Sequence, residues 1–309
     1  MSEQNKRKKV AVVGAGAVGG YFGGMLARAG VPVVLIGRPA FAEAVNKNGL
    51  RIDSTKFQET VRVEAASEIS AAAGADIVLF CVKTTDTAAV SRELKKHISP
   101  ESVVVSLQNG VNNVEEIRDA SGIEAIPSVV YVAAAMPVPG VIKHLGRGDL
   151  VVGPANERTE QLASYLASGD VPCRVSDIIE GELWTKLVWN CALNAVSALG
   201  RSTYGEIYAS AGARRLVENL VYEVLSVARA KGVHPPGLDD PKAALAGAMK
   251  IAEQMSGTRS STAQDMVRNK KTEIDSLNGY VAKLGEKLGV PVPANQAMHA
   301  LVKLVEATY

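Results

Sequence analysis

Residues that build disulfide frameworks and metal centres are scarce in this sequence. Its three cysteines are odd in number and scattered along the chain, at Cys81, Cys173 and Cys191. That distribution excludes a disulfide framework and favours a reducing compartment, the cytoplasm. The histidines are equally dispersed, at His97, His144, His234 and His299, so no pair of them has the spacing of metal ligands. We therefore expect a cytoplasmic protein that binds no metal.

A strong charge bias and long apolar runs are also lacking. The formal net charge is +2 over 309 residues, so a nucleic-acid partner is not indicated. The one basic cluster, at residues 6–9, precedes the first strand and is interpreted as a solvated tail. No apolar run approaches the roughly 20 residues of a membrane span. Glycines interrupt the apolar stretch that begins at Val10, so a signal-peptide core is not expected.

The residues that are present predict two domains, which meet near residue 175. With 47% hydrophobic and 21% charged residues, the composition is typical of a soluble globular protein, and the length suffices for two domains. In the first half, helical stretches separate buried apolar runs at Val10–Val13, Val33–Ile36, Ile77–Val82 and Val103–Leu107. Such runs are typical of a parallel sheet that is covered on both faces.

Beyond Pro127 the pattern changes twice. Runs at Val129–Ala133, Val141–His144 and Leu150–Val152 are separated by turns with proline or glycine, which predicts antiparallel strands that finish the sheet. From about Ser176 onward, periodicity predicts helices over 177–199, 204–231, 241–256, 260–288 and 294–307. The expected architecture is a Rossmann-type α/β domain over 1–175 and an all-α domain over 176–309.

A glycine motif follows the first predicted strand and opens a helix. Its residues, which match G-x-G-x-x-G, are Gly14, Ala15, Gly16, Ala17, Val18 and Gly19. In that context the glycines permit a tight turn, close approach of the backbone to a pyrophosphate, and close helix packing. The helix N-terminus offers free N–H groups and a partial positive charge to phosphates. The alternative is a glycine-rich turn without a ligand.

The end of the second strand distinguishes NAD from NADP. An NAD site usually places an acidic residue there for the ribose 2′-hydroxyl, but this chain has no acidic residue from Gln4 to Ala42. Arg38 stands at that strand end instead, and a guanidinium can bind a 2′-phosphate through two hydrogen bonds. We therefore predict NADP(H) as the cofactor. The alternative for Arg38 is an exposed loop arginine.

Two polar residues follow later strands of the predicted parallel sheet. Lys83 comes after Ile77–Val82, and Asn109 comes after Val103–Leu107. Open α/β sheets bind ligands at the carboxyl ends of their strands, so both are candidates for the cofactor site. Lys83 could equally be a solvated loop lysine, and Asn109 with the following glycine could form a simple turn.

A second group of polar residues lies on the first helix of the predicted all-α domain. Residues 183–199 are apolar nearly all round and contain one charge, Lys186, so the helix should be buried. Lys186, Asn190 and Asn194 are spaced i, i+4, i+8 and line one face. Because burial of an isolated ammonium is very costly, this line predicts a polar cleft. The alternative is a snorkelling lysine beside two satisfied core asparagines.

The predicted helix 260–288 carries two further candidates. Glu273 shares its expected face with Met266, Leu277 and Tyr280, so it should point inward; the alternative is an ion pair with Lys270. Ser261, near the start of the helix, fits a capping box with Gln264. The same helix end is also suited to a substrate carboxylate.

Taken together, these segments resemble the ketopantoate reductase family over nearly the whole chain. The stretches that carry the resemblance are VAVVGAGAVGG, FCVKTTDT, SLQNGV, KLVWNCALN and RSSTAQDMVRNKKTEIDSLNGY. The resemblance implies that the second domain has the helical fold of 6-phosphogluconate dehydrogenase and that the active site lies in the interdomain cleft. It also implies that Lys186 is the general acid and that Glu273 helps to bind the substrate.

The same resemblance assigns the remaining candidates. Residues that match the substrate pocket are Asn109, Asn190, Asn194 and Ser261. Residues that match cofactor positions are Gly14, Gly16, Gly19, Arg38 and Lys83, and Asn109 is also a candidate there. The implied reaction is NADPH-dependent reduction of 2-dehydropantoate to pantoate, a step of coenzyme A biosynthesis, by a monomer or homodimer. Two alternatives remain: a reductase of another branched or aromatic 2-oxo acid, and a non-catalytic dinucleotide sensor.

Overall fold

The computed structural model describes residues 7–309, which group into two units. Unit 1 comprises the chain up to Gln108 together with Asn112–Ile179. Unit 2 comprises Asn109–Val111 and Glu180–Tyr309. An α/β unit and an all-α unit are thus present, which confirms the predicted fold class. In the described part of the chain, no helix is long and apolar enough to span a bilayer.

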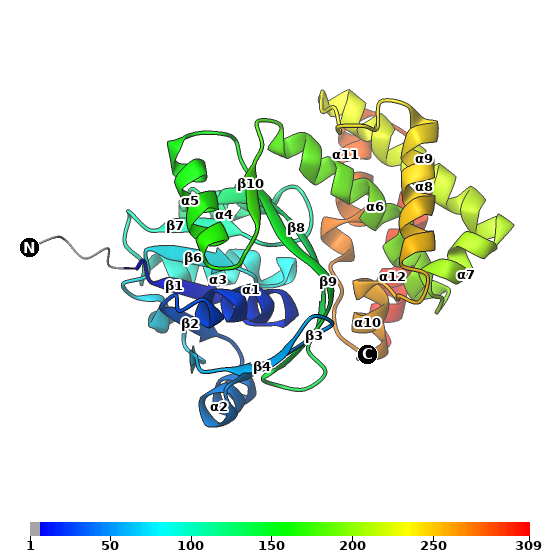
Figure 1. The fold of residues 1–309 in the computed structure, drawn as a ribbon. Coiled ribbons are helices and arrows are strands. Elements are labelled where there is room, and N and C mark those ends of the chain that lie inside the picture. Colours follow the sequence, from blue (N-terminus) through cyan, green and yellow to red (C-terminus); the bar gives the residue numbers. More distant parts are fainter. Residues whose placement is uncertain (1–6) are drawn as a thin grey trace, which may run out of the picture. The chain divides into compact units, whose positions relative to one another are not determined.

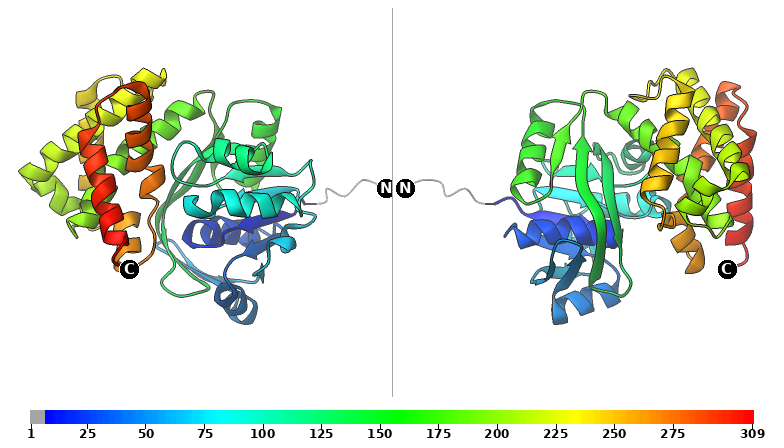
Figure 2. Two further views of the ribbon diagram at one scale, coloured as in Figure 1. Left: turned by 180° about the vertical axis from the view of Figure 1, so that it is seen from behind. Right: turned by 45° about the vertical axis from the view of Figure 1, so that its right-hand side comes forward.

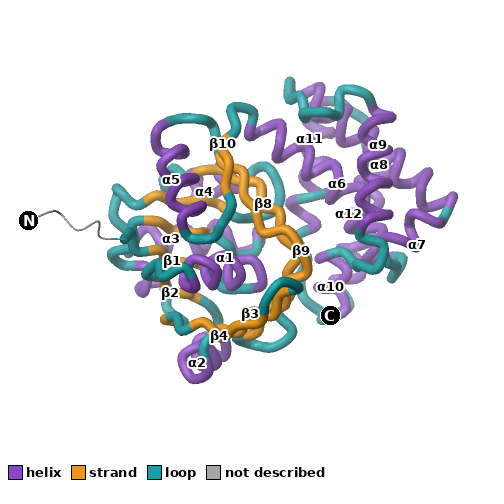
Figure 3. Tube along the Cα trace, in the orientation of Figure 1, coloured by secondary structure: helices purple, strands orange, loops and turns teal. Residues whose placement is uncertain are grey.

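Unit 1 is built on a sheet of ten strands within the described residues (Figures 1 and 3). Its order is β4-β3-β9-β8-β7-β6-β1-β2-β5, and β10 pairs with β9. The strands are β1 (Val10–Val13), β2 (Val33–Ile36), β3 (Leu50–Ser54), β4 (Gln58–Val61), β5 (Glu64–Ala66), β6 (Ile77–Phe80), β7 (Val103–Ser106), β8 (Ile126–Ala135), β9 (Val141–Val152) and β10 (Cys173–Val175). From β7 to β5 all pairs are parallel.

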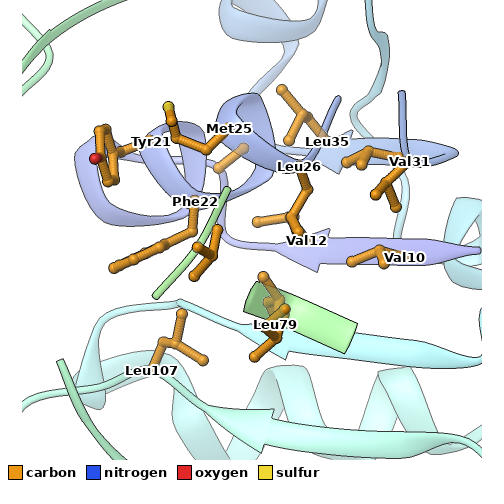
Figure 4. Close-up of a cluster of buried hydrophobic side chains, with 14 of the residues drawn as sticks. Val10, Val12, Tyr21, Phe22, Met25, Leu26, Val31, Leu35, Leu79 and Leu107 are labelled. Atoms are coloured by element: carbon orange, nitrogen blue, oxygen red, sulfur yellow. The ribbon is translucent and has the colours of Figure 1, made fainter. Parts of the chain in front are cut away.

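Alternation along the parallel strands produces a core on each face of the sheet. Val10 and Val12 of β1 point into one cluster, and Ala11 and Val13 point into the other. The first cluster lies under helix α1 (Ala17–Arg28), whose Phe22 and neighbouring residues are shown in Figure 4. Helices of this unit also include α2 (Pro39–Asn48), α3 (Thr87–Lys95), α4 (Asn113–Ser121) and α5 (Glu157–Ser168), with short 3₁₀ turns η1 (Ile69–Ala72) and η2 (Thr84–Asp86).

Helices of unit 1 cover both faces of the sheet and contribute side chains to both clusters. Leu94 of α3 and Ile117 of α4 are fully buried against the face of Ala11. Leu162 and Leu166 of α5 pack on the opposite face with α1. Burying one such side chain stabilises the fold by about 1.5–3 kcal/mol, which accounts for strands that are apolar at every position, as predicted.

Three details of unit 1 differ from the sequence prediction. Strands β3, β4 and β5 were not expected, because their exposed positions break the apolar pattern. The two runs predicted around Gly146 form one continuous strand, β9, which pairs antiparallel with β8 as expected. It also pairs parallel with β3, so it does not finish the sheet.

The basic cluster is not simply a solvated tail. Lys6 lies outside the described residues, but Arg7 donates a 2.7 Å hydrogen bond to the carbonyl of Ala29. The Lys9 ammonium donates to the carbonyl of Ala73 at 3.0 Å. These two side chains therefore have hydrogen-bond partners on neighbouring segments of unit 1, while Arg7 and Lys8 remain exposed, as the prediction of a solvated segment expects.

Unit 2 is helical and is organised around α6 (Ile179–Leu199). The other helices are α7 (Tyr204–Ala209), α8 (Ala211–Lys231), α9 (Pro241–Gln254), α10 (Ser261–Val267), α11 (Asn278–Leu288) and α12 (Pro293–Glu306), with a 3₁₀ turn η3 (Ile274–Ser276). Trp184 and Leu187 of α6 are buried in one cluster with residues of α8, α9 and α12. In the two views of Figure 2, α11 and α12 (orange and red) lie side by side.

Two predicted helices of unit 2 are interrupted. The helix expected over 204–231 breaks at Ser210, which ends α7 and caps α8 by accepting a hydrogen bond from the Ala213 N–H. The helix expected over 260–288 breaks after Val267, where Asn269 has a left-handed φ of +49°. Asparagine tolerates this conformation better than most residues, so a polar loop at 268–273 replaces the middle of the predicted helix.

Candidate functional site

The glycine motif forms the turn between β1 and α1, and contacts within the protein require glycine at Gly14 and at Gly19. Gly14 has a φ of +94°, and a Cβ there would lie 2.6 Å from the Val82 backbone nitrogen. A Cβ on Gly19 would lie 2.6 Å from the Gly14 carbonyl oxygen, so only glycine lets the helix pack on the strand. A Cβ on Gly16, by contrast, would meet no atom within 4 Å. The second glycine therefore faces open space rather than the protein.

This turn fits the diphosphate of a dinucleotide. The three glycines serve the tight turn, the close ligand approach and the helix packing that such a site needs. Gly16 is the N-cap of α1, where no side chain caps the helix and no acidic residue lies in the first turn. The amide groups of Ala17 and Val18 belong to this first turn, whose partial positive charge favours phosphate. Ala15 is buried and donates its N–H to the Ile36 carbonyl, which fixes the turn against β2.

Strands β1, β2 and β6 end at the same edge of the parallel sheet, and this brings the other cofactor candidates near the turn. Arg38 follows β2, caps α2 with its backbone and has an exposed side chain. Within residues 7–309 its guanidinium has no ion-pair partner. Lys83 follows β6 directly after Cys81 and Val82, whose backbone touches the Gly14 position. The placement of both residues suits a nucleotide bound at this edge.

One hydrogen-bonded chain joins three predicted site residues in unit 2. The Lys186 ammonium donates to the Asn109 Oδ1 atom at 2.9 Å. The Asn109 Nδ2 atom donates in turn to the Glu273 Oε2 atom at 3.0 Å. The amide is thereby oriented by its partners, with its oxygen toward the cation and its nitrogen toward the anion. Asn109 is therefore more than a turn residue: it connects a candidate proton donor to a carboxylate.

Helix α6 supplies Lys186 and the two asparagines, as the spacing predicts. Lys186 and Asn190 are half-buried, whereas Asn194 is only 5% exposed. Asn194 Oδ1 accepts a 3.0 Å hydrogen bond from the hydroxyl of Tyr204. Burial raises the pKa of Tyr204 to about 12, so this hydroxyl remains a donor. Asn194 is thus partly satisfied inside the unit, as the alternative interpretation held, while Asn190 and Lys186 reach its surface.

Glu273 reaches the cluster in a way that the sequence did not predict. It is not helical: it lies in the loop after α10, directly before η3. The argument from a shared helix face was therefore wrong, although the expected inward direction is compatible with its bond to Asn109. The alternative pairing with Lys270 is not the contact that positions the carboxylate.

The start of α10 also differs from the prediction. Ser260, not Ser261, is the N-cap, and its Oγ atom accepts from the Ala263 N–H at 3.0 Å. The same hydroxyl donates to the Asn194 backbone carbonyl at 2.9 Å, which ties α10 to α6. Ser261 is the exposed first residue of the helix, so its hydroxyl is available for the predicted substrate role, which remains a prediction.

Two residues near the candidate sites were not singled out from the sequence. Buried Gln108 joins the ends of β7 and β6 to the start of α3, because its Nε2 atom donates to the Val82 carbonyl and to the Thr87 hydroxyl. Tyr204, described above, holds Asn194. The position of Gln108 at a strand end was a usable signal, whereas nothing local linked Tyr204 to a residue ten positions earlier.

Two family models match consecutive parts of the chain. The model described as ketopantoate reductase PanE/ApbA matches residues 10–157. The model described as ketopantoate reductase PanE/ApbA C terminal matches residues 178–306. Together they cover both the α/β half and the helical half, including every candidate residue above.

Known proteins give the same result. A 2-dehydropantoate 2-reductase of Pyrococcus abyssi is 31% identical over 97% of this chain and 98% of its own length. The crystal structure of a PanE/ApbA family ketopantoate reductase from Ralstonia eutropha is 46% identical, has a TM-score of 0.91 and covers 97% and 99% of the two chains. A 2-dehydropantoate 2-reductase from Geobacter metallireducens is 27% identical with a TM-score of 0.88, covering 96% and 99%.

Proposed function

Because this chain belongs to the ketopantoate reductase family, we propose that it reduces 2-dehydropantoate (ketopantoate) to pantoate with NADPH, a step of pantothenate and coenzyme A biosynthesis. The observation that carries the proposal is the chain of hydrogen bonds from Lys186 through Asn109 to Glu273. It combines a proton donor with a fixed anion and an amide, which is what reduction of a hydroxylated oxo acid requires. When bound, NADPH supplies the hydride for the C2 carbonyl carbon.

Lys186 is proposed as the general acid. The keto oxygen gains negative charge as C2 is reduced, and the ammonium both stabilises that charge and donates the proton. Asn109 holds the ammonium at 2.9 Å, so its direction is set before substrate binds. Geometry of this kind supplies a large part of an enzyme's rate.

Glu273 is proposed to bind the hydroxyl group of the substrate. One of its oxygens accepts from Asn109, and a carboxylate has further lone pairs for a second donor. A half-buried carboxylate placed to accept from a hydroxyl also gives specificity, because an oxo acid without that group cannot make this hydrogen bond. Asn190, Asn194 and Ser261 are proposed to orient the rest of the substrate.

The cofactor is proposed to bind at the edge of the parallel sheet in unit 1. The glycine turn and the α1 N-terminus fit its diphosphate. Arg38 is proposed to bind the 2′-phosphate, and the absence of acidic residues from Gln4 to Ala42 supports NADPH over NADH. Lys83 and Asn109 are proposed as further cofactor contacts.

The test is an absorbance assay at about 340 nm with NADPH and NADH side by side and a panel of 2-oxo acids. The panel holds ketopantoate, its analogue without the 4-hydroxyl, and branched and aromatic oxo acids. We expect ketopantoate with NADPH to give the highest kcat/KM. A preference for an analogue without the hydroxyl would favour the other reductase function, and no turnover with any acid would favour a dinucleotide sensor. Cytoplasmic location and the choice between monomer and homodimer stay predictions.

A further inference from the structure

The loop that carries Glu273 is anchored by the last helix of the chain. Thr272 is buried, and both its backbone N–H and its hydroxyl donate to the Glu306 Oε1 atom of α12, at 2.7 and 2.6 Å. The Thr272 hydroxyl also accepts from the Ile274 N–H at 3.2 Å. Residues 272 and 274 are thus joined around Glu273, and their common oxygen is held by Glu306.

The other side of the loop is anchored to the same helix. Asp275 receives hydrogen bonds from the His299 ring at 2.7 Å and from the Lys303 ammonium at 2.9 Å. Lys303 also pairs with the Glu306 Oε2 atom at 3.0 Å. Glu273 therefore lies between two attachment points on α12, at Thr272 and at Asp275, and Lys303 links the two.

The Glu306 side chain is buried and fully paired, as anchoring of the loop requires. Its side chain is only 5% exposed, in contrast to the 40% of Lys303. Each of its oxygens has a partner, and two of the three bonds are to the residue directly before Glu273. The backbone N–H groups of residues 268–270 still donate to carbonyls of α10, whereas the N–H of Thr272 donates to Glu306 instead, so the segment directly before Glu273 is held from α12.

We propose that Glu306 is a positioning residue, which acts through Thr272 to keep the Glu273 carboxylate on Asn109 and, through that amide, keeps the Lys186 ammonium aimed. The proposal rests on the proposed function, because it takes Glu273 as a substrate contact. A displacement of about 1 Å at such a group costs up to about 10²-fold in rate. The C-terminal helix is thereby part of the machinery for substrate binding.

The test is a double-mutant cycle with Glu306→Ala and Glu273→Gln, followed in kcat/KM for ketopantoate. We expect Glu306→Ala to lower kcat/KM about tenfold or more in the parent protein, and by less than about twofold when Glu273 is already replaced. Equal effects in both backgrounds would overturn the positioning role. Glu306→Gln keeps an oxygen for both Thr272 donors and should restore kcat/KM to within about threefold of the parent.

A matched control is Glu223→Ala. Glu223 also accepts backbone N–H bonds at α12, from Ala294 and Asn295, but among the described residues it makes no hydrogen bond or ion pair with residues 272–276. The two alanine variants should lose similar thermal stability. Only Glu306→Ala should lose kcat/KM when both are assayed well below their unfolding temperatures; a loss of the same size in both would contradict the proposal.

Hydrogen exchange separates a failure of this inference from a failure of the proposed function. In Glu306→Ala, amides of residues 272–276 should exchange at least about tenfold faster, whatever the chain's substrate. Unchanged exchange would overturn the anchoring by Glu306. If exchange rises but no oxo acid is turned over by the parent protein, the proposed function fails while the anchoring stands.

Discussion

The glycine turn of unit 1 and the polar cluster of unit 2 are stabilised by different kinds of contact. In the turn, six consecutive residues take their shape from contacts of the backbone with itself and with the adjacent strand end. In the cluster, Asn109 meets Lys186 and Glu273 across 77 and 164 residues of chain, through side chains alone. The turn is therefore vulnerable to added atoms, and the cluster is vulnerable to lost ones.

The largest effect should come from the cluster. Lys186→Ala removes the proposed acid and leaves the Asn109 oxygen without its cationic donor, so we expect kcat to fall by at least about 10²-fold. NADPH binding, measured by fluorescence titration, should be retained because the glycine turn is untouched. Near-normal turnover would sink the assignment of Lys186 as the acid.

Within the glycine turn, alanine at Gly16 and alanine at Gly19 should have different effects. An added methyl group at Gly16 meets nothing within 4 Å, whereas at Gly19 it lies 2.6 Å from the Gly14 carbonyl. We expect Gly16→Ala to keep its Tm within about 2 °C and to weaken NADPH binding about tenfold or more, because the methyl occupies the ligand's approach. Gly19→Ala should lower Tm by several degrees through overpacking, of about 1–3 kcal/mol.

Differential scanning calorimetry and NADPH titration on the same two variants check this contrast. A normal NADPH affinity in Gly16→Ala would show that the open space at this glycine is not used by the cofactor. An unchanged Tm in Gly19→Ala would show that the helix shifts without cost, against the steric argument.

This contrast explains what the sequence could predict. The turn, helix α6 and the strands β1, β2, β6 and β7 were predicted because each is determined by residues close together in the chain. Strands β3 and β4 were missed because their exposed alternate residues hide the pattern that pairing imposes. Both are short, and β4, at the edge of the sheet, has Val61 as its one buried residue.

The polar cluster shows more clearly what could not be predicted from the sequence. The i, i+4, i+8 spacing identified the Lys186 face correctly, but continuous periodicity across 260–288 hid the loop that carries Glu273. The loop depends on tertiary hydrogen bonds from Thr272 to Glu306, which lie 34 residues apart. The sequence near Thr272 contains no signal for such a bond. Glu273 was therefore selected because it was expected to point inward from a helix, whereas it lies in a loop.

An effect confined to one cofactor should distinguish NADPH from NADH. Arg38→Ala removes a guanidinium that has no ion-pair partner among residues 7–309. If it binds the 2′-phosphate, its loss should weaken NADPH by roughly 10–100-fold and leave NADH nearly unchanged. Equilibrium titration with each cofactor measures the ratio. An equal effect on both would refute the 2′-phosphate role and leave Arg38 as an exposed loop residue.

The smallest effect concerns acid stability and tests how firmly α12 holds its loop. The pKa of Glu306 lies below its ordinary value of 4.5: burial raises it, but the bonds from Thr272 and the ammonium of Lys303 together outweigh burial. A carboxyl with a lowered folded-state pKa stabilises the protein above its unfolded value, and this contribution is lost as pH falls through the folded value. Glu306→Gln should therefore lower Tm near pH 7, and the difference from the parent should shrink below about pH 4.5.

Tm measured from about pH 7 to about pH 3.5 checks this expectation. Asp275 also has a lowered pKa, because its bonds with His299 and Lys303 outweigh burial, but it is present in both proteins, so its contribution largely cancels in the difference. Glu286→Gln is the control, because Glu286 is exposed on α11 and has no ion pair among the described residues. A Glu306→Gln difference that stayed constant with pH would mean that its carboxylate charge adds nothing to the anchoring, and that hydrogen bonding alone places Glu273.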